Sequence, residues 1–437
     1  MRTRAFFGWC LGTIVLLSGA LNSLAQPTPS APGLLAGPMV AGVRPTEALI
    51  WVQLRAGQQA WVVAQDSATL GVSSPPNTSP ANPANPASGA ARCHLTGLHP
   101  ATWYRYQVWL IGWSRPAGSG HFRTPPADTA TTDFTFALGS CAFIADPYPA
   151  GGYPIFFRIH EQHPDLMLWL GDNVYLWGGE WNDPAAAIRR YAHTRAAPEL
   201  APLLANTAHA AIWDDHDVGP NSSDSTLPTR ATMLDVFRQF WAPDFYAAPP
   251  GGTTGHFSWG DAEFFLLDNR YWRTPRRGTP RRARSQLGAA QRAWLLKGLR
   301  ASTATFKFVA VGGQVLTTSV HGETFARGFR AERRALLRAL DSAQIKNVVF
   351  LTGDRHFAEL SVRRPRAAPA QYDLTASPLT AGPAKPGANR LRVAGTVIQG
   401  NNFATIKLSG PRGARKITFS GFDATGERRW QRIVAAE

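Results

Sequence analysis

The feature that most constrains the fold of this chain is a series of short apolar runs that end in small or polar, often acidic, residues. The runs are 134–141 (FTFALGSC), 165–173 (DLMLWLGDN), 209–217 (HAAIWDDHD), 263–270 (EFFLLDNR), 306–313 (FKFVAVGG) and 348–356 (VVFLTGDRH). Their length and composition are typical of buried strands. Helical patterns at 230–241, 287–299 and 331–343 lie between them. Because strands and helices alternate, the sequence predicts a layered α/β (α+β) domain over residues 133–437.

Residues 34–126 have a different pattern and form a second predicted domain. The stretches 47–54, 59–66 and 102–112 are rich in β-branched and aromatic residues and alternate with period two. This pattern predicts an N-terminal β-sandwich, joined to the rest by a linker over 125–132. A chain of 437 residues exceeds the size at which one core usually stops growing, so two domains are expected.

Ligand-type side chains follow five of the predicted strands. In layered sheets, ligands bind beyond the carboxyl ends of the strands, so these side chains are expected to converge. They are Cys141, Asp172, Asp215, Asp268 and Asp354. A single Asp after a strand is usually a turn or helix-cap residue. Five together, three of them within the strings GDN, DDHD and GDRH, favour a shared site.

Several carboxylates and a thiolate in one pocket repel one another, and their burial is costly unless cations neutralise them. The sequence therefore predicts a metal site. Two metal ions also supply a mechanism, because they clamp a phosphate and a metal-bound water loses a proton near neutral pH to become the nucleophile.

Several strings, in this order, resemble the PhoD-type alkaline phosphatases of the calcineurin-like metallophosphoesterase superfamily. They are ALGSC (137–141), LGDNVY (170–175), WDDHDVGPN (213–221), LDNRYWR (267–273) and TGDRHFAEL (352–360). The opening 37–53 is similar to the fibronectin type III-like N-terminal domain of that family, and the strands near the C-terminus resemble its closing strands. The resemblance runs from about residue 34 to the C-terminus and implies hydrolysis of phosphate mono- or diesters.

The resemblance also implies a set of metal ligands. Ferric iron is expected on Cys141, with Asp172 bridging the two metals and Tyr175 as a further iron ligand through its phenolate. The second metal is expected to be calcium, which suits the oxygen ligands of Asp215 and Asn221, with other divalent metals as the alternative. The closing ligands are Asp354 and His356. Alternatively, Cys141 is a small buried hydrophobe and Tyr175 covers the core with its ring.

Three further residues are predicted to act on the substrate. His216 is expected to bind phosphate or protonate the leaving group, with a pKa raised by its acidic neighbours. Asp217 is expected to orient His216. Arg270 is expected to touch phosphate through its guanidinium fork, or else to be a surface charge. Asp268 is alternatively a turn former, and His321 is left without a role.

The N-terminus reads as an export signal. Arg2 and Arg4 precede an apolar stretch, and Ser23 and Ala25 place small residues before a cut at Gln26, so residues 1–25 are expected to be removed. An uncleaved anchor is the alternative. The two arginines are not adjacent, which favours Sec export over the twin-arginine route common in the family and puts metal loading outside the cytoplasm. The mature chain is then expected to be periplasmic or secreted, without a membrane span.

Removal of residues 1–25 leaves Cys93 and Cys141 in the mature chain. They lie in different predicted domains and are expected to be free thiols, with Cys93 buried on a strand. The formal net charge of +16 suits a phosphate ester, a nucleic acid or an anionic membrane equally. Seven arginines fall within 270–285. Such a run is usually a solvated loop, but here it follows LDNR and suggests a polyanionic substrate.

Three rival functions fit the sequence less well. A non-catalytic, calcium-stabilised extracellular binding protein does not need a histidine within the string WDDHD. No nucleic-acid-binding motif accompanies the positive charge, so no specific nucleic-acid partner is expected. A serine nucleophile at Ser140 lacks the pattern G-x-S-x-G and a nearby base.

Overall fold

The computed structural model describes residues 33–68, 77–82, 85–127, 130–241, 244–248 and 251–437. The predicted signal segment 1–25 lies outside the described residues. The first ten strands are β1 (Leu34–Arg44), β2 (Glu47–Leu54), β3 (Ala60–Asp66), β4 (Asn77–Pro80), β5 (Ala90–Thr96), β6 (Trp103–Leu110), β7 (Gly118–Arg123), β8 (Phe134–Gly139), β9 (Leu166–Leu170) and β10 (Ala208–Ile212). The later strands are β11 (Gly255–Trp259), β12 (Ala262–Leu266), β13 (Phe306–Val311), β14 (Val348–Thr352), β15 (Phe357–Arg363), β16 (Gln371–Thr375), β17 (Ile398–Gln399), β18 (Asn402–Ser409), β19 (Lys416–Asp423) and β20 (Arg428–Ala435).

Helices lie in the connections from β8 to β9, β9 to β10, β10 to β11, β12 to β13 and β13 to β14. The α-helices are α1 (Ile155–His160), α2 (Pro184–Arg195), α3 (Ala201–Asn206), α4 (Asp215–Val218), α5 (Arg230–Trp241), α6 (Ala289–Ala301), α7 (Phe325–Gly328) and α8 (Arg330–Ser342). Short 3-10 helices are η1 (Glu180–Asn182), η2 (Pro198–Leu200) and η3 (Asp244–Ala247).

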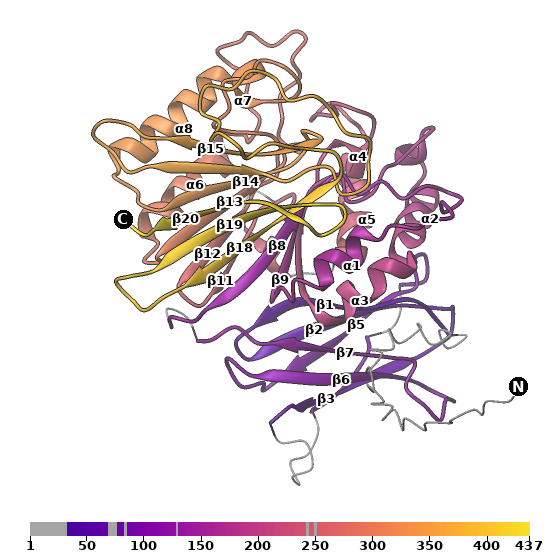
Figure 1. Cartoon of the computed structure of the whole chain (residues 1–437). Coiled ribbons are helices and arrows are strands. Elements are labelled where there is room, and N and C mark those ends of the chain that lie inside the picture. Colours follow the sequence, from indigo (N-terminus) through magenta and orange to yellow (C-terminus); the bar gives the residue numbers. More distant parts are fainter. Residues whose placement is uncertain (1–32, 69–76, 83–84, 128–129, 242–243, 249–250) are drawn as a thin grey trace, which may run out of the picture.

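Two large sheets pack face to face at the centre of the molecule (Figure 1). One has the strand order β20-β19-β18-β8-β9-β10-β1-β2-β5, and the other has the order β11-β12-β13-β14-β16-β15-β17. Phe136 on β8 makes edge-to-face contacts with Phe264 on β12 and Phe308 on β13, with ring centroids 5.2 and 4.9 Å apart. These aromatic side chains form the interface between the sheets because apolar residues face inward from both.

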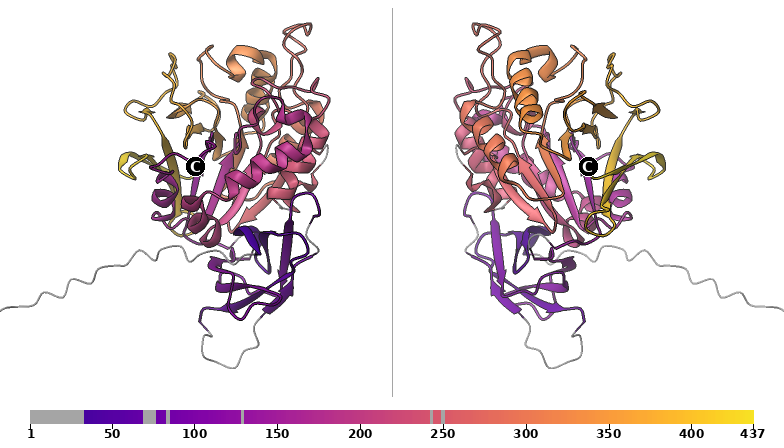
Figure 2. Two further views of the ribbon diagram at one scale, coloured as in Figure 1. Left: turned by 90° about the vertical axis from the view of Figure 1, so that its right-hand side faces the viewer. Right: turned by 90° about the vertical axis from the view of Figure 1, so that its left-hand side faces the viewer.

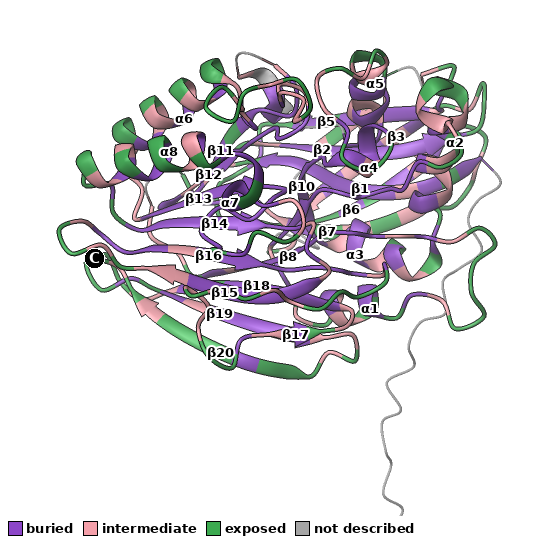
Figure 3. Ribbon diagram, turned by 90° about the horizontal axis from the view of Figure 1, so that it is seen from above, coloured by how far each residue is buried: buried purple, intermediate pink, exposed green. Residues whose placement is uncertain are grey.

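Helices cover the outer face of each large sheet. Leu295 on α6 and Leu336 on α8 pack in one cluster with residues of β13 and β14, while the opposite sides of these helices are exposed (Figure 3). On the other sheet, Trp169 of β9 contacts Phe156 of α1 and Trp241 of α5. The resulting helix–sheet–sheet–helix arrangement confirms the layered fold predicted from alternating strands and helices.

The N-terminal strands form an antiparallel β-sandwich at the lower end of the molecule (Figure 2). Its outer sheet has the order β4-β3-β6-β7, and its inner strands are β1, β2 and β5. β1 also pairs in parallel with β10, with Val40 opposite Ala208, so the larger sheet continues across the predicted boundary between 34–126 and 133–437. That division into two domains stays a prediction. Cys93 is buried on β5, and both it and Cys141 are free thiols, as expected.

Parallel pairing sets the position of the loops that matter for function. β8, β9 and β10 are parallel neighbours in one sheet, and β12, β13, β14 and β16 are parallel neighbours in the other. The loops at their carboxyl ends therefore meet along one edge of the double layer. Among the described residues, no helix has the length and apolarity that crossing a membrane requires.

Candidate functional site

The predicted metal ligands lie just beyond the carboxyl ends of separate strands. Cys141 follows β8, Asp172 follows β9, Asp215 follows β10, and Asp354 and His356 follow β14. Backbone hydrogen bonds tie the first two loops together, because the N–H of Cys141 donates to the carbonyl of Gly171 at 3.2 Å.

Strained backbone is concentrated at these same positions. Nine described residues other than glycine have a positive φ, and four of them are Cys141 (57°), Asp172 (50°), Asp354 (65°) and His356 (57°). A non-glycine residue in this region costs on the order of 1–3 kcal/mol, and such residues cluster at binding and active sites. All four residues follow the strands whose carboxyl ends border the proposed site.

One group of possible metal donors is formed by Asp172, Asp215 and His216, which offer ligand atoms within 4.8 Å of one another. The Cys141 thiol lies 3.5 Å from Oδ2 of Asp172 and accepts a hydrogen bond of 3.2 Å from the hydroxyl of Ser377. Cys141 and Asp172 are both buried. The structure thus places the predicted thiolate beside the predicted bridging carboxylate.

A second group consists of Asp214, Asp215 and Asp354, again with ligand atoms within 4.8 Å of one another. Asp215 belongs to both groups, so the two groups are adjacent. Gly312, at the end of β13, lies against them, and a Cβ there would clash with the carboxylate of Asp214 and the amide of Asn269. The absence of a side chain at this position keeps space for the Asp214 carboxylate.

His356 has its ring fixed by the backbone. Its Nδ1 pairs with the carbonyl oxygen of Gly382. A carbonyl can only accept, so Nδ1 carries the proton and Nε2 keeps its lone pair. Metal-binding histidines commonly have this arrangement, in which a carbonyl or carboxylate holds the nitrogen that does not bind the metal.

The aromatic ring of Tyr175 stacks on the His216 ring, with centroids 4.3 Å apart, and contacts Phe143 edge to face. Burial raises the pKa of Tyr175, and the nearby charges of Cys141 and Asp172 raise it further. The ring therefore packs at the edge of the site, with its hydroxyl directed toward the acidic groups.

Burial and mutual repulsion act strongly on the acidic groups. Burial raises the pKa of Asp172 well above its usual value, and the charges of Asp215 and Asp214 raise it further. Burial, together with Asp172, likewise raises the pKa of Cys141 well above normal. The pKa of Asp354 is also raised, first by burial and then by the charge of Asp214. A bound cation would remove the repulsion and favour the ionised forms.

The donor atoms suit metal ions. The buried oxygens Asp214 Oδ2 and Tyr175 Oη have no hydrogen-bond partner among the described residues, and Asp354 Oδ2 has only Nη1 of Arg355, at 3.7 Å. Buried polar atoms without partners are uncommon and call for an explanation such as a bound ion. Carboxylate oxygens suit hard cations, while a thiolate and an imidazole suit transition metals. The residues present therefore fit a mixed metal centre.

Arg270 is buried among carboxylates and is not the surface charge that the sequence left open. Its side chain is 1% exposed, and Nη2 lies 2.8 Å from Oε2 of Glu323 and 3.4 Å from Oδ1 of Asp215. Nε also pairs with Asp214. Burial opposes the charge of Arg270, but these carboxylates together raise its pKa well above normal. Its contacts are with the acidic cluster, and its predicted contact with phosphate stays a prediction.

Glu323 connects two arginines. It pairs with Arg270 and, at 2.6 Å, with Nη1 of Arg273, and it also accepts from the hydroxyl of Ser222. Although burial opposes this, the two guanidiniums lower the pKa of Glu323. Glu323 was not predicted, because it lies in a loop without a recognisable pattern.

Asp217 has contacts that differ from those expected. It accepts hydrogen bonds from the backbone N–H of Asp214 at 2.9 Å and of Asn173 at 3.1 Å, and the Tyr191 hydroxyl lies 3.4 Å away. Adjacent residues on a helix do not face each other, so Asp217 on α4 points away from His216. Asp217 holds the loop after β9 against α4, and orienting His216 is not among its observed contacts.

The remaining expectations have mixed outcomes. Burial lowers the pKa of His216 and outweighs the opposite effect of Asp215, so the expected rise is wrong in sign. Asp268 accepts from the N–H groups of Arg270 and Tyr271, which is the turn-forming alternative. Asn221 is exposed, but the next residue, Ser222, donates its N–H to Asp215 at 2.6 Å, so its loop is tied to the cluster.

Asp214 is a member of the cluster that the sequence interpretation missed. The string WDDHD signals an acidic strand end, but it does not reveal that both of its first two carboxylates face the site. That depends on the turn between β10 and α4, where Asp214 is the N-cap residue.

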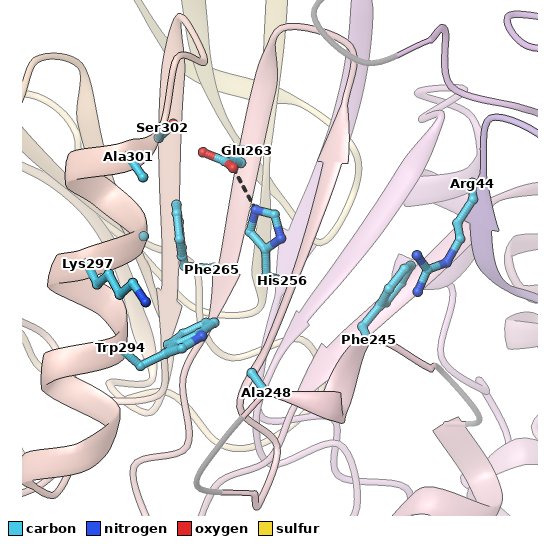
Figure 4. A pocket seen from close by; sticks show the side chains of 11 residues that line it. Arg44, Phe245, Ala248, His256, Glu263, Phe265, Trp294, Lys297, Ala301 and Ser302 are labelled. Atoms are coloured by element: carbon cyan, nitrogen blue, oxygen red, sulfur yellow. Dashed lines mark hydrogen bonds and ion pairs between the residues drawn. The ribbon is translucent and has the colours of Figure 1, made fainter.

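A separate pocket of about 530 Å³ is bordered by α6 and by the strands β11 and β12 of the second large sheet (Figure 4). It is bordered by His256, Glu263 and Trp294, and His256 hydrogen-bonds to Glu263 at 2.8 Å. None of the predicted site residues lines it.

Comparison with known proteins identifies a family for this chain. The model of the family described as PhoD-like phosphatase matches residues 136–420. Alkaline phosphatase D of Bacillus subtilis (strain 168) is 26% identical over 311 residues, which cover 60% of this chain and 52% of the relative. The chain thus spans about half the length of this curated relative.

Solved structures share the fold. The structure of PhoD has a TM-score of 0.71 at 19% identity and covers 94% of both chains. The purple acid phosphatase PPD1 from yellow lupin (Lupinus luteus) seeds has a TM-score of 0.64 at 12% identity, covering 91% of this chain and 74% of the other. The resemblance stated from the motifs is confirmed. The family model covers more than half of the residues of this chain, so the chain belongs to the PhoD-like phosphatase family.

Proposed function

We propose that this chain is an exported, metal-dependent phosphoesterase that hydrolyses phosphate mono- or diesters. The observation that carries the proposal is the pair of donor groups that share Asp215, one with Asp172 and His216 and the other with Asp214 and Asp354, with the Cys141 thiol beside Asp172. Family membership and the name of the Bacillus subtilis relative, alkaline phosphatase D, support the same reaction.

Two metal ions in this site would clamp the phosphate, neutralise its charge and activate a water as the nucleophile. We propose ferric iron on the side of Cys141, with Tyr175 as a further ligand, because a thiolate and a phenolate suit that ion. Calcium is proposed on the side of Asp215, with Asn221 contributing from its loop. Asp172 is the proposed bridge.

The residues of the chain position the ester and hold the charged groups apart. The ring of His216 faces Asp172 and Asp215 and is held by stacking on Tyr175, so it is placed to hydrogen-bond to an ester oxygen. Arg270 forms ion pairs with Asp214 and Asp215 and neutralises part of their negative charge. The proposed role of Arg270 is therefore to keep these carboxylates in place, with any phosphate contact secondary to that.

We also propose that residues 1–25 direct export and that the mature protein is periplasmic or secreted. The positive residues, apolar stretch and small residues before Gln26 support this. Comparing the N-terminus of the protein recovered outside the cytoplasm with Gln26 tests it. A chain retained in the cytoplasm with Met1 intact would contradict export.

Hydrolysis assays test the main proposal. Purified wild type, Asp172→Ala and the surface control Glu427→Ala are assayed with nitrophenyl phosphate and with bis-nitrophenyl phosphate. Glu427 is exposed, and its carboxylate pairs with Arg429 at the surface. Wild type and Glu427→Ala are expected to hydrolyse at least one ester, and Asp172→Ala is expected to lose about a hundredfold or more. A folded wild type that hydrolyses neither ester would instead favour the non-catalytic binding protein.

A further inference from the structure

A second cavity, of about 480 Å³, is lined almost entirely by arginine side chains. Two of them come from the arginine-rich loop 270–285, and the others come from α7 and the first turns of α8, which lie at the top of the molecule (Figure 1). They are Arg281, Arg282, Arg327, Arg330 and Arg334. No acidic side chain of the described residues lines this cavity. Its volume falls within the range of small-ligand sites, roughly 300–1,000 Å³.

The positive charge in this arginine cavity is not neutralised by the protein. Arg327 and Arg330 donate to the backbone carbonyls of Gly322 and Ala326, which holds their side chains in place. By contrast, Arg273 in the same loop region pairs with Glu323. Within the described part of the chain, the five cavity arginines have no acidic partner, and such a concentration of like charge attracts anions.

Arg276 links the arginine cavity to the acidic cluster. A Cβ on Gly328 of α7 would lie 3.8 Å from Cδ of Arg276, so Arg276 packs against the cavity wall. Partial burial and the charge of Arg327 lower the pKa of Arg276, while Glu323 acts in the opposite direction. Glu323 in turn contacts Arg270 at the edge of the cluster. Arg276 and Glu323 therefore lie between the arginine cavity and the acidic cluster, which places the cavity next to the proposed site of hydrolysis.

We propose that the arginine cavity is a subsite for a second phosphate group, on a substrate whose scissile phosphate lies at the acidic cluster. The substrate class is a chain of repeated phosphodiester groups. One guanidinium group can donate two parallel hydrogen bonds to the oxygens of a phosphate. Several guanidinium groups together hold a flexible polyanion better than a single charge does. The inference rests on the proposed function, since it concerns where the rest of the substrate binds.

The pocket in Figure 4 offers no comparable site. Arg44 and Lys297 share it with Glu263 and three aromatic side chains, so its charge is mixed. The arginine cavity also gives Arg281 and Arg282 of the run 270–285 a role in substrate binding. The sequence alone could not place α7 and α8 beside that loop.

The test compares two esters that have the same leaving group. One is thymidine 5′-(nitrophenyl phosphate), with one phosphate, and the other is an oligothymidylate that carries the same nitrophenyl ester at its end. The test variant is Arg281→Gln with Arg282→Gln and Arg334→Gln, and all three residues are exposed. The matched control removes the same charge through Arg115→Gln, Arg366→Gln and Arg428→Gln, which are exposed elsewhere.

We expect the cavity variant to raise KM for the oligothymidylate ester about tenfold and to leave the one-phosphate ester within about twofold. The slope of log KM against log salt concentration is expected to fall by about 0.7 for each phosphate group that the variant no longer binds. The control variant is expected to match wild type with both esters. Normal turnover of the one-phosphate ester shows that each variant is folded.

Other outcomes separate the subsite from the catalytic proposal. Equal changes in the cavity and control variants, or equal changes with both esters, would overturn the subsite while hydrolysis stands. If wild type hydrolyses neither ester, binding of unmodified oligothymidylate is measured by fluorescence anisotropy. Loss of that binding in the cavity variant alone would keep the subsite, and binding that does not depend on these arginines would overturn it.

Discussion

The thiol sulfur of Cys141 lies 3.5 Å from Oδ2 of Asp172, and both side chains are buried. Two groups that are both negative when ionised are held together here at the ends of neighbouring strands. Such a contact is favourable when a cation lies between or beside them. The contact therefore supports a metal ligand at Cys141 more than a small buried hydrophobe.

The chain offers a matched test of this interpretation, because Cys93 is equally buried but lies in the β-sandwich. Cys141→Ser is expected to reduce bound metal and to lower kcat/KM about tenfold or more, since a serine hydroxyl does not ionise as a thiol does. Cys93→Ser is expected to lower the melting temperature without loss of metal. Elemental analysis and ester hydrolysis measure both. Full metal content in Cys141→Ser would contradict its role as a ligand.

Gly312 is expected to tolerate no side chain. Gly312→Ala places a Cβ against the Asp214 carboxylate and the Asn269 amide, so the carboxylate must move. We expect a loss of about 1–3 kcal/mol in the free energy of unfolding and at least a tenfold loss of activity. Gly151 serves as the control, because nothing lies within 4 Å of a Cβ built there. Similar behaviour of Gly312→Ala and Gly151→Ala would show that the cluster does not need this space.

The Glu323 carboxylate is expected to stabilise the fold through its buried pairs with Arg270 and Arg273. Glu323→Gln leaves these guanidiniums without one of their counter-charges, and we expect a loss of about 3 kcal/mol or more in the free energy of unfolding. Glu161→Gln breaks the exposed pair with Arg158 and should cost less than about 1 kcal/mol. Urea denaturation of both variants measures the difference. Equal small losses would mean that Glu323 has no special role.

The pH dependence of stability is expected to report on Asp373, which is buried away from the proposed ligands. Burial raises its pKa from 3.8 to about 6, while N–H groups of Leu316 and Val315 act against that rise. As the pH rises, the unfolded chain releases this proton at a lower pH than the folded chain does. The contribution of Asp373 to the free energy of unfolding is therefore highest below pH 4 and falls as the pH rises toward 6. The fall is roughly 3 kcal/mol, from 1.36 kcal/mol per pKa unit.

The isosteric variant Asp373→Asn isolates this effect. Its amide oxygen can accept the same backbone N–H groups, and its amide can donate to Thr352, whose hydroxyl now donates to Asp373. The free energy of unfolding of the variant relative to wild type should increase between pH 4 and pH 7. A constant difference over that interval would contradict a raised pKa at Asp373.

Much of the fold followed from the sequence, since the apolar runs became the parallel strands β8, β9, β10, β12, β13 and β14. Strand ends also located most of the site, because parallel strands must bring their carboxyl ends to one edge. Pairing between β1 and β10 could not be foreseen, because edge-to-edge contacts between sheets depend on tertiary packing and leave no local pattern.

The errors within the site have a common physical cause. The direction of each side chain around a tight turn is set by backbone angles that the sequence does not specify. Asp214, the N-cap residue of α4, faces the cluster, and Asp217 within α4 turns away from His216. Arg270 and Glu323 meet through loops that are distant in the chain, and only the folded structure brings them together.

The most direct test of the account is the metal content of the purified, full-length mature chain, measured by elemental analysis for wild type and Asp172→Ala. Two metal ions per wild-type chain are expected, with loss of metal and activity together in Asp172→Ala and recovery of wild-type activity when metal is restored after chelation. A wild type that is folded and fully active with no bound metal would contradict the central claim.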